Sequence, residues 1–154
     1  MNEATKTLLM NTVKEWGKYV SEREKITMIA YDVAQLSRRV IQECLAFMKA
    51  QRVEVECDTL ENLKVLGVPI QVNPTIEAAF PAVKATVVLK CGGATRAIVV
   101  NPNYTISAGG TPIAYEQLKK GIPDLFAANA AEFVRDAFLN VARTGGKEEK
   151  PIAN

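Results

Sequence analysis

The feature that most constrains this chain is the segment 22–50, where apolar side chains recur every three or four residues without an intervening Gly or Pro. This spacing predicts an amphipathic helix. At a rise of about 1.5 Å per residue the helix is about 43 Å long, whereas a compact domain of this chain length has a diameter of about 38 Å. A helix of that length usually packs on another helix, from its own chain or from another subunit.

The apolar series in this segment follows a heptad, which Glu43 interrupts. Because a heptad is the pattern of helices that pair along their length, it predicts a subunit interface in a homodimer or higher oligomer. The predicted interface residues are Ile26, Ile29, Val33, Leu36, Val40 and Phe47.

The preceding residues, 3–20, suit a second amphipathic helix. Its apolar residues are Leu9, Val13, Trp16 and Val20. Ser21 with Glu24 matches a capping box, which indicates a restart of the helix there. The two segments then form an N-terminal helical pair, with 3–20 folded back on 22–50 or paired between chains; the alternative is one bent helix.

After Gln51 the apolar period changes to two, which indicates strands. We expect strands over 53–58, 68–72, 83–91, 94–100 and 104–107, and a loop over 73–81 between two prolines. For the hairpin around Gly92 and Gly93, a three-residue loop that pairs Leu89 with Ala97 segregates polar and apolar residues better than a two-residue turn. In that register Arg96 and Lys90 share a face that is apolar at its middle.

Two helices are expected towards the C-terminus. Thr111 and Pro112 resemble an N-cap and a first helical residue, opening a short helix to about Lys120. The last helix, about 125–143, buries a stripe that includes Phe126 and Phe133 and places its polar residues outside. Those polar residues are Asn129, Glu132, Arg135, Asp136 and Asn140.

The order of elements predicts one α+β domain over residues 1–146, with an antiparallel sheet of three to five strands between the N-terminal helical pair and the C-terminal helices. Residues 147–154 are expected to be a mobile tail. The sequence shows neither a spanning-length apolar run nor a signal-peptide pattern. We therefore expect no membrane partner, no secretion by a signal peptide, and a location in the cytoplasm or within an assembled particle.

The chain contains no histidine and three widely spaced cysteines, Cys44, Cys57 and Cys91. The missing histidine rules out Ser-His-Asp triads, Cys-His dyads and His-ligated zinc, and no CxxC is present. Without a histidine base, Cys91 is not expected to act as a nucleophile. These observations favour a protein that is not an enzyme and needs no cofactor.

Three carboxylates alternate along the first predicted strand, Glu54, Glu56 and Asp58. Three carboxylates on one side of a strand are able to hold Mg²⁺, which would suit a metal-dependent enzyme. The simpler interpretation is the charged solvent face of a half-exposed strand. A metal site is therefore the third hypothesis.

A second candidate is a basic surface, because residues 78–123 contain five basic side chains against one acidic. Cations beside aromatic rings on a sheet are typical of single-stranded nucleic-acid binding. The residues concerned are Lys84, Lys90, Arg96, Lys119, Lys120 and Tyr104. The net charge of only +2 makes this the alternative rather than the leading hypothesis.

The loop from Ser107 to Thr111, with Gly109 and Gly110, precedes a predicted helix and would be able to hold an anion, although it lacks a phosphate-binding motif. The leading hypothesis is a non-enzymatic, self-assembling or protein-binding protein. Its partner is itself, with other protein subunits as further partners. A structural or accessory component of a larger particle, such as a virus or phage, is the setting we expect.

Overall fold

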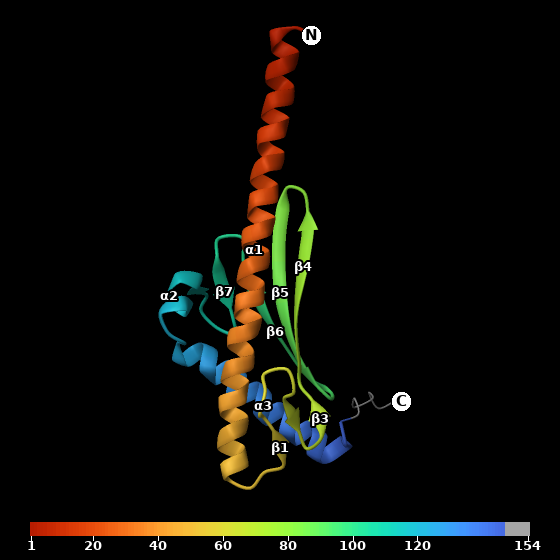
Figure 1. Cartoon of the computed structure of the whole chain (residues 1–154), viewed down its shortest axis with the longest axis vertical. Coiled ribbons are helices and arrows are strands. Elements are labelled where there is room, and N and C mark those ends of the chain that lie inside the picture. Colours follow the sequence, from red (N-terminus) through yellow and green to blue (C-terminus); the bar gives the residue numbers. More distant parts are fainter. Residues whose placement is uncertain (147–154) are drawn as a thin grey trace, which may run out of the picture.

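The computed structural model describes residues 1–146 and is dominated by one helix, α1, from Glu3 to Ala50 (Figure 1). Its 48 residues correspond to about 72 Å of helix. The side chain of Asn2 caps the first turn by accepting a hydrogen bond from the Thr5 N–H at 2.8 Å. The break predicted near Ser21 does not occur, so residues 3–20 neither fold back on 22–50 nor form a separate helix.

The helix continues through residues 17–24 because nothing there stops it. Gly17 costs a helix only about 1 kcal/mol relative to Ala, and no proline lies in this stretch. Ser21 and Glu24 are compatible with a helix interior as well as with a cap.

The eight strands within residues 1–146 are all antiparallel and form two sheets, and so the α+β class and the antiparallel sheet are confirmed. The small sheet contains β1 (Val55–Glu56), β2 (Lys64–Val65) and β3 (Val68–Pro69). The large sheet has the order β4 (Gln71–Ala79), β5 (Ala82–Cys91), β6 (Ala94–Val100), β7 (Thr105–Ser107) and β8 (Ile113–Ala114).

The expected loop over 73–81 is wrong, since residues 71–79 form β4 and pair with β5 along their whole length. Pro74 is tolerated because β4 is an edge strand, where the missing N–H interrupts no second ladder. On the same edge, Arg38 of α1 donates to the Val72 carbonyl at 2.7 Å.

The C-terminal part contains α2 (Tyr115–Lys120) and α3 (Asp124–Thr144). The short helix expected to begin at Pro112 begins three residues later, at Tyr115, because β8 takes Ile113 and Ala114 into the sheet. The predicted C-terminal tail, 147–154, lies outside the described residues.

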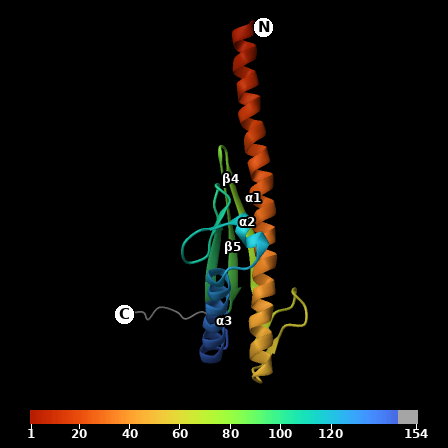
Figure 2. The ribbon, with the colours of Figure 1, turned by 90° about the vertical axis from the view of Figure 1, so that its left-hand side faces the viewer.

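Both long helices cover the same face of the large sheet, as the view from the side shows for α1 (Figure 2). Along β5 the residues that face the helices are buried, whereas those on the other face are exposed or half-buried. The buried side chains are Val83, Ala85, Val87, Leu89 and Cys91. The opposite face is called the open face here.

The hairpin between β5 and β6 uses a two-residue turn, Gly92 and Gly93, and pairs Leu89 with Arg96. The predicted pairing of Leu89 with Ala97 is therefore wrong by one residue. Arg96 lies on the helix-covered face because α3 supplies polar partners for it there. With Arg96 on that face, the open face carries Lys84, Thr86, Val88, Lys90, Thr95, Ala97 and Val99.

Among the helices that the structure describes, none is both long and apolar enough to cross a membrane.

Candidate functional site

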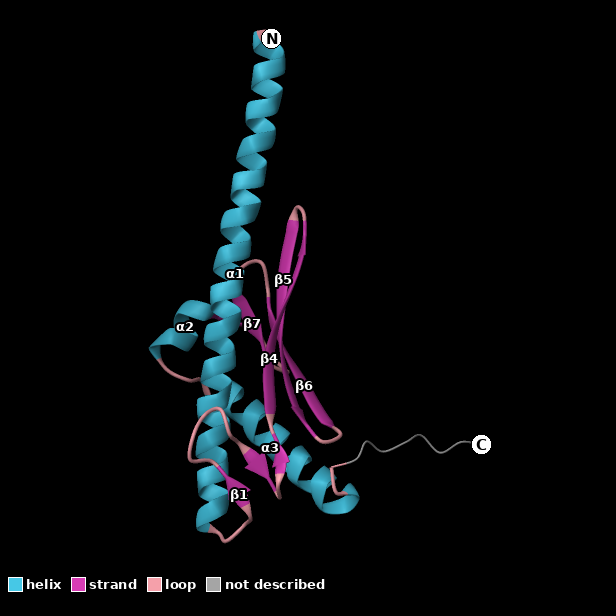
Figure 3. Cartoon of the chain, turned by 45° about the vertical axis from the view of Figure 1, so that its right-hand side comes forward, coloured by secondary structure: helices cyan, strands magenta, loops and turns pink. Residues whose placement is uncertain are grey.

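Every residue of α1 from Glu3 to Lys18 is exposed, and this stretch projects beyond the sheet (Figure 3). We call residues 3–18 the arm and residues 19–146 the body. The arm is about 24 Å long at the usual helical rise. Since most helical stability in proteins comes from packing of an apolar face, an uncovered arm is the exceptional feature of this fold.

An apolar stripe runs along the arm, formed by Leu9, Val13 and Trp16, whose side chains are 48%, 62% and 52% exposed. At about 100° per residue this stripe lies roughly a quarter turn away from the side of α1 that packs on the sheet. Apart from Trp16 at its base, the arm stripe is therefore not a continuation of the contact that α1 makes with its own body.

The base of the arm is held by three aromatic rings. Phe80, at the tip of the β4–β5 hairpin, lies with its ring centroid 5.8 Å from Trp16 and 5.3 Å from Tyr19. Contacts at these distances are favourable by about 0.5–1.5 kcal/mol beyond the area they bury. The cluster fixes where the arm leaves the body, yet leaves about half of Trp16 uncovered.

Two tyrosines outside α1, Tyr104 and Tyr115, form hydrogen bonds with side chains of α1. The Tyr104 hydroxyl donates to Glu22 and the Tyr115 hydroxyl donates to Asp32. The hydrogen bond to Glu22 raises the pKa of Tyr104, and burial together with the Asp32 bond raises that of Tyr115. Both hydroxyls thus stay protonated and donating at neutral pH, and they help set the direction of α1 relative to the body.

The predicted interface of segment 22–50 is largely used within the chain. Ile26, Ile29, Val33 and Val40 are buried in the core of the body, and Leu36 is half-buried. Phe47 is 69% exposed, beside an apolar groove of about 470 Å³ between the end of α1 and α3. The sequence predicted the apolar residues of the arm stripe but left open whether they pack within one chain or between chains, because the pattern alone does not identify a partner.

The residues predicted to bind nucleic acid lie on separate surfaces. Lys84 and Lys90 are on the open face, whereas Arg96 is beneath α3. Lys119 and Lys120 belong to α2, and the Tyr104 ring lies under the Lys25 ammonium at 3.8 Å. The structure does not bring these six residues together into one basic surface.

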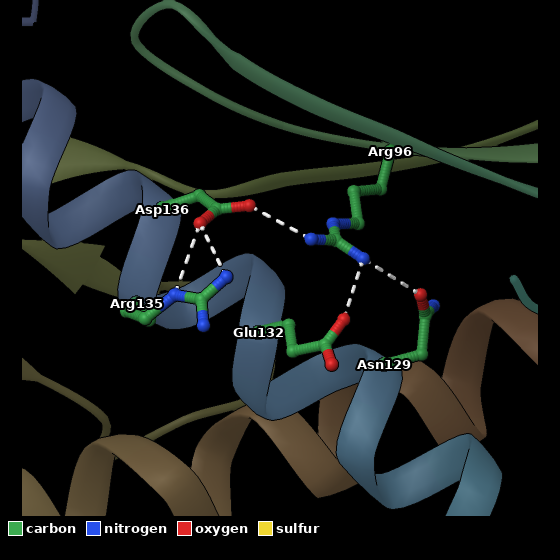
Figure 4. A network of polar contacts seen from close by, with 5 residues as sticks. All are labelled: Arg96, Asn129, Glu132, Arg135 and Asp136. Atoms are coloured by element: carbon green, nitrogen blue, oxygen red, sulfur yellow. Dashed lines mark hydrogen bonds and ion pairs between the residues drawn. The ribbon is translucent and has the colours of Figure 1, made fainter.

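Arg96 is instead the centre of a polar network with α3 (Figure 4). Its Nη1 lies 3.2 Å from Asn129 Oδ1 and 3.0 Å from Glu132 Oε2, and its Nη2 lies 2.8 Å from Asp136 Oδ2. Arg135 contacts the other oxygen of Asp136 at 3.1 Å. This network joins β6 to α3 and leaves Arg96 only 26% exposed.

Two of the three carboxylates predicted to hold a metal ion form separate ion pairs with lysine side chains. Glu56 lies 3.8 Å from Lys64, and Asp58 lies 3.7 Å from Lys49. Within residues 1–146 no group of three or more Cys, Asp or Glu side chains is arranged to hold a metal ion. The Ser107–Thr111 loop leads into β8 rather than into a helix, which removes the helix N-terminus that the anion hypothesis required.

A change of pH tests the Arg96 network. The hydrogen bond from Arg96 holds the pKa of Asp136 below its ordinary value, so this carboxylate stabilises the fold above its unfolded-state pKa of about 4. That contribution is lost as the pH falls through the lower, folded-state pKa. Because the Asp136 side chain is 38% exposed, we expect Asp136→Asn to cost only about 1 kcal/mol at pH 7.

Urea unfolding of the wild type and of Asp136→Asn at pH 7 and pH 3 measures this effect. The difference in unfolding free energy should shrink at the lower pH. A difference that grows on acidification would show that the Asp136 carboxylate is not stabilised by Arg96.

Comparison with known proteins gives no relative: no protein-family model matches the chain, and no match is found among the curated proteins or the solved structures. Function must therefore be argued from the geometry.

Proposed function

We propose that this protein is a non-enzymatic, self-assembling protein whose arm binds a helix of another subunit. The observation that carries the proposal is the exposed arm of α1, with its stripe of Leu9, Val13 and Trp16. Most helical stability in proteins comes from the packing of an apolar face, and the arm packs on its own chain only at its base, where Trp16 meets Phe80. Covering the stripe with a second helix removes apolar surface from water, at about 25 cal/mol per Å².

Two of the three thiols, those of Cys44 and Cys91, support a role other than nucleophilic catalysis. Burial raises the pKa of Cys91 to about 11 and raises that of Cys44 as well. At neutral pH both are therefore protonated, and the thiolate is the form that attacks a substrate. Metal-dependent and nucleic-acid functions are supported less, because their residues are dispersed over the body.

The open face and the exposed Phe47 give the body further surface for contacts. We propose that the open face and Phe47 contact other subunits within a larger assembly, and that the arm forms the primary contact between subunits. The arm stripe is apolar, so the association it drives should depend little on salt, unlike one between charged surfaces.

Sedimentation equilibrium from micromolar to tens of micromolar tests the proposal. We expect a species of at least twice 16.8 kDa that persists in high salt. Trp16 is the only tryptophan in the chain, and its emission should shift to longer wavelength as dilution exposes it. A single 16.8 kDa species at every concentration, with unchanged emission, would overturn the proposal.

A further inference from the structure

We infer that the arm pairs with the arm of a second copy of this chain, and that the two arms run antiparallel with Leu9 of each opposite Val13 of the other. This inference rests on the proposed function and specifies its partner and geometry. It follows from which residues share the apolar stripe and what they meet in each orientation.

The line of contact between two paired arms, here called the seam, includes a cation, Lys6. Leu9, Val13 and Trp16 are separated by four and three residues, which is the spacing of the two core positions of a heptad. Extending the series backwards by three residues from Leu9 gives Lys6, one heptad before Val13. Lys6 therefore lies in line with the stripe rather than on the outer side of the arm.

A parallel pair would bring like charges together. In a parallel in-register dimer each core residue faces its own copy, so Lys6 would meet Lys6 of the second chain. A heptad after Trp16 comes Arg23, which would also face its copy. Two like-charge contacts along one seam oppose this orientation.

An antiparallel pair gives Lys6 a favourable partner instead. When Leu9 faces Val13, residues whose numbers sum to 22 lie opposite each other, so Lys6 lies against Trp16 of the second arm. Trp is the best aromatic partner for a cation, and Trp16 is half exposed, with its contacts to Tyr19 and Phe80 at the base of the arm. The seam then contains two cation–π contacts and two Leu–Val contacts.

The antiparallel register also suits the shape of the molecule. Residue 3 of one arm lies opposite residue 19 of the other, so the overlap ends where each body begins. The two bodies lie at opposite ends of the paired arms. The full length of the exposed arm is covered without contact between the bodies.

Replacing Lys6 by Gln separates the two orientations, because it removes repulsion from a parallel dimer and removes two cation–π contacts from an antiparallel one. The antiparallel pair predicts a dimer Kd about 5- to 30-fold higher than that of the wild type. Lys18→Gln is the matched control, since it removes the same charge on the side of the arm away from the stripe, and its Kd should be unchanged. A lower or unchanged Kd for Lys6→Gln would overturn the inference.

A distance measurement gives an independent result. A spin label on Glu3→Cys, in a Cys44→Ser background that removes the one native thiol that is not buried, should lie about 24 Å along the axis from its copy in the antiparallel dimer. In a parallel dimer the two labels would be about 10 Å apart. Labels in close contact would overturn the antiparallel geometry while leaving self-assembly intact, whereas a monomer would overturn the proposed function itself.

Discussion

Val13→Glu is expected to convert the assembly into monomers while the body keeps its fold. Val13 lies at the middle of the arm stripe, and pairing of the arms would bury one introduced carboxylate from each copy. Fully burying an unpaired charge costs several kcal/mol even after relaxation; at roughly 2 kcal/mol for each carboxylate only partly covered by a two-helix contact, the two raise the free energy of the dimer by roughly 4 kcal/mol. This corresponds to an increase of about 1,000-fold in Kd, which sedimentation equilibrium measures directly.

The same substitution should leave the unfolding temperature of the monomeric body unchanged. Val13 is 62% exposed and lies in the part of α1 outside the body, and Glu is a better helix former than Val. Loss of assembly would therefore not reflect loss of the helix, which circular dichroism checks.

Asn11→Glu is the matched control for Val13→Glu. It adds the same charge to the same exposed arm, on the side turned away from the stripe. Its Kd should stay within a few-fold of the wild-type value. Equal weakening by both substitutions would mean that net charge, rather than the stripe, governs association.

The helical character of residues 3–20 and 22–50 could be predicted from sequence, but neither their continuity in one helix nor the partner of that helix could. Apolar residues at helical spacing over 3–20 and 22–50 indicate amphipathic helices whatever covers them. Whether the Leu9–Trp16 stripe meets its own chain or another one depends on whether the helix breaks between the two segments. Ser21 and Glu24 did not decide this, because a hydroxyl and a carboxylate three residues apart are equally acceptable inside a helix.

The hairpin register was predicted wrongly because Arg96 was placed, on the basis of its charge, on the same face of the sheet as Lys90. The choice of turn assumed that a cation belongs on the solvent face. In the structure Arg96 lies on the helix-covered face, where Glu132 and Asp136 of α3 neutralise it. A pairing between residues 36 and 40 positions apart leaves no local signal in the sequence.

The same reason explains the two asparagines that were expected outside α3. Asn129 and Asn140 are only 7% and 9% exposed, because each amide has a partner on the hairpin. Asn129 accepts from Arg96, and Asn140 accepts from the Gly93 N–H at 2.8 Å. A polar residue on the buried side of a helix is stable when its hydrogen bonds are satisfied, and helical periodicity cannot reveal such a partner.

Arg96→Glu is expected to destabilise the body more than any surface change. It removes the cation that Glu132 and Asp136 share and places a third carboxylate between them, at a position where the wild-type side chain is only 26% exposed. Breaking a buried ion pair costs about 3–5 kcal/mol. Because the two partner carboxylates are 51% and 38% exposed, we expect about 3 kcal/mol, measured by urea unfolding at neutral pH.

Two further variants show whether this loss comes from the network. Lys84→Glu makes the same charge change on the open face of the neighbouring strand, opposite Glu77, and should cost under about 1 kcal/mol. Asp136→Arg in the Arg96→Glu background restores an ion pair with its charges exchanged, and should recover at least about 1 kcal/mol. If the double variant were no more stable than Arg96→Glu alone, the position would be sensitive to size rather than to charge, and the packing of α3 on β6 would not depend on this ion pair.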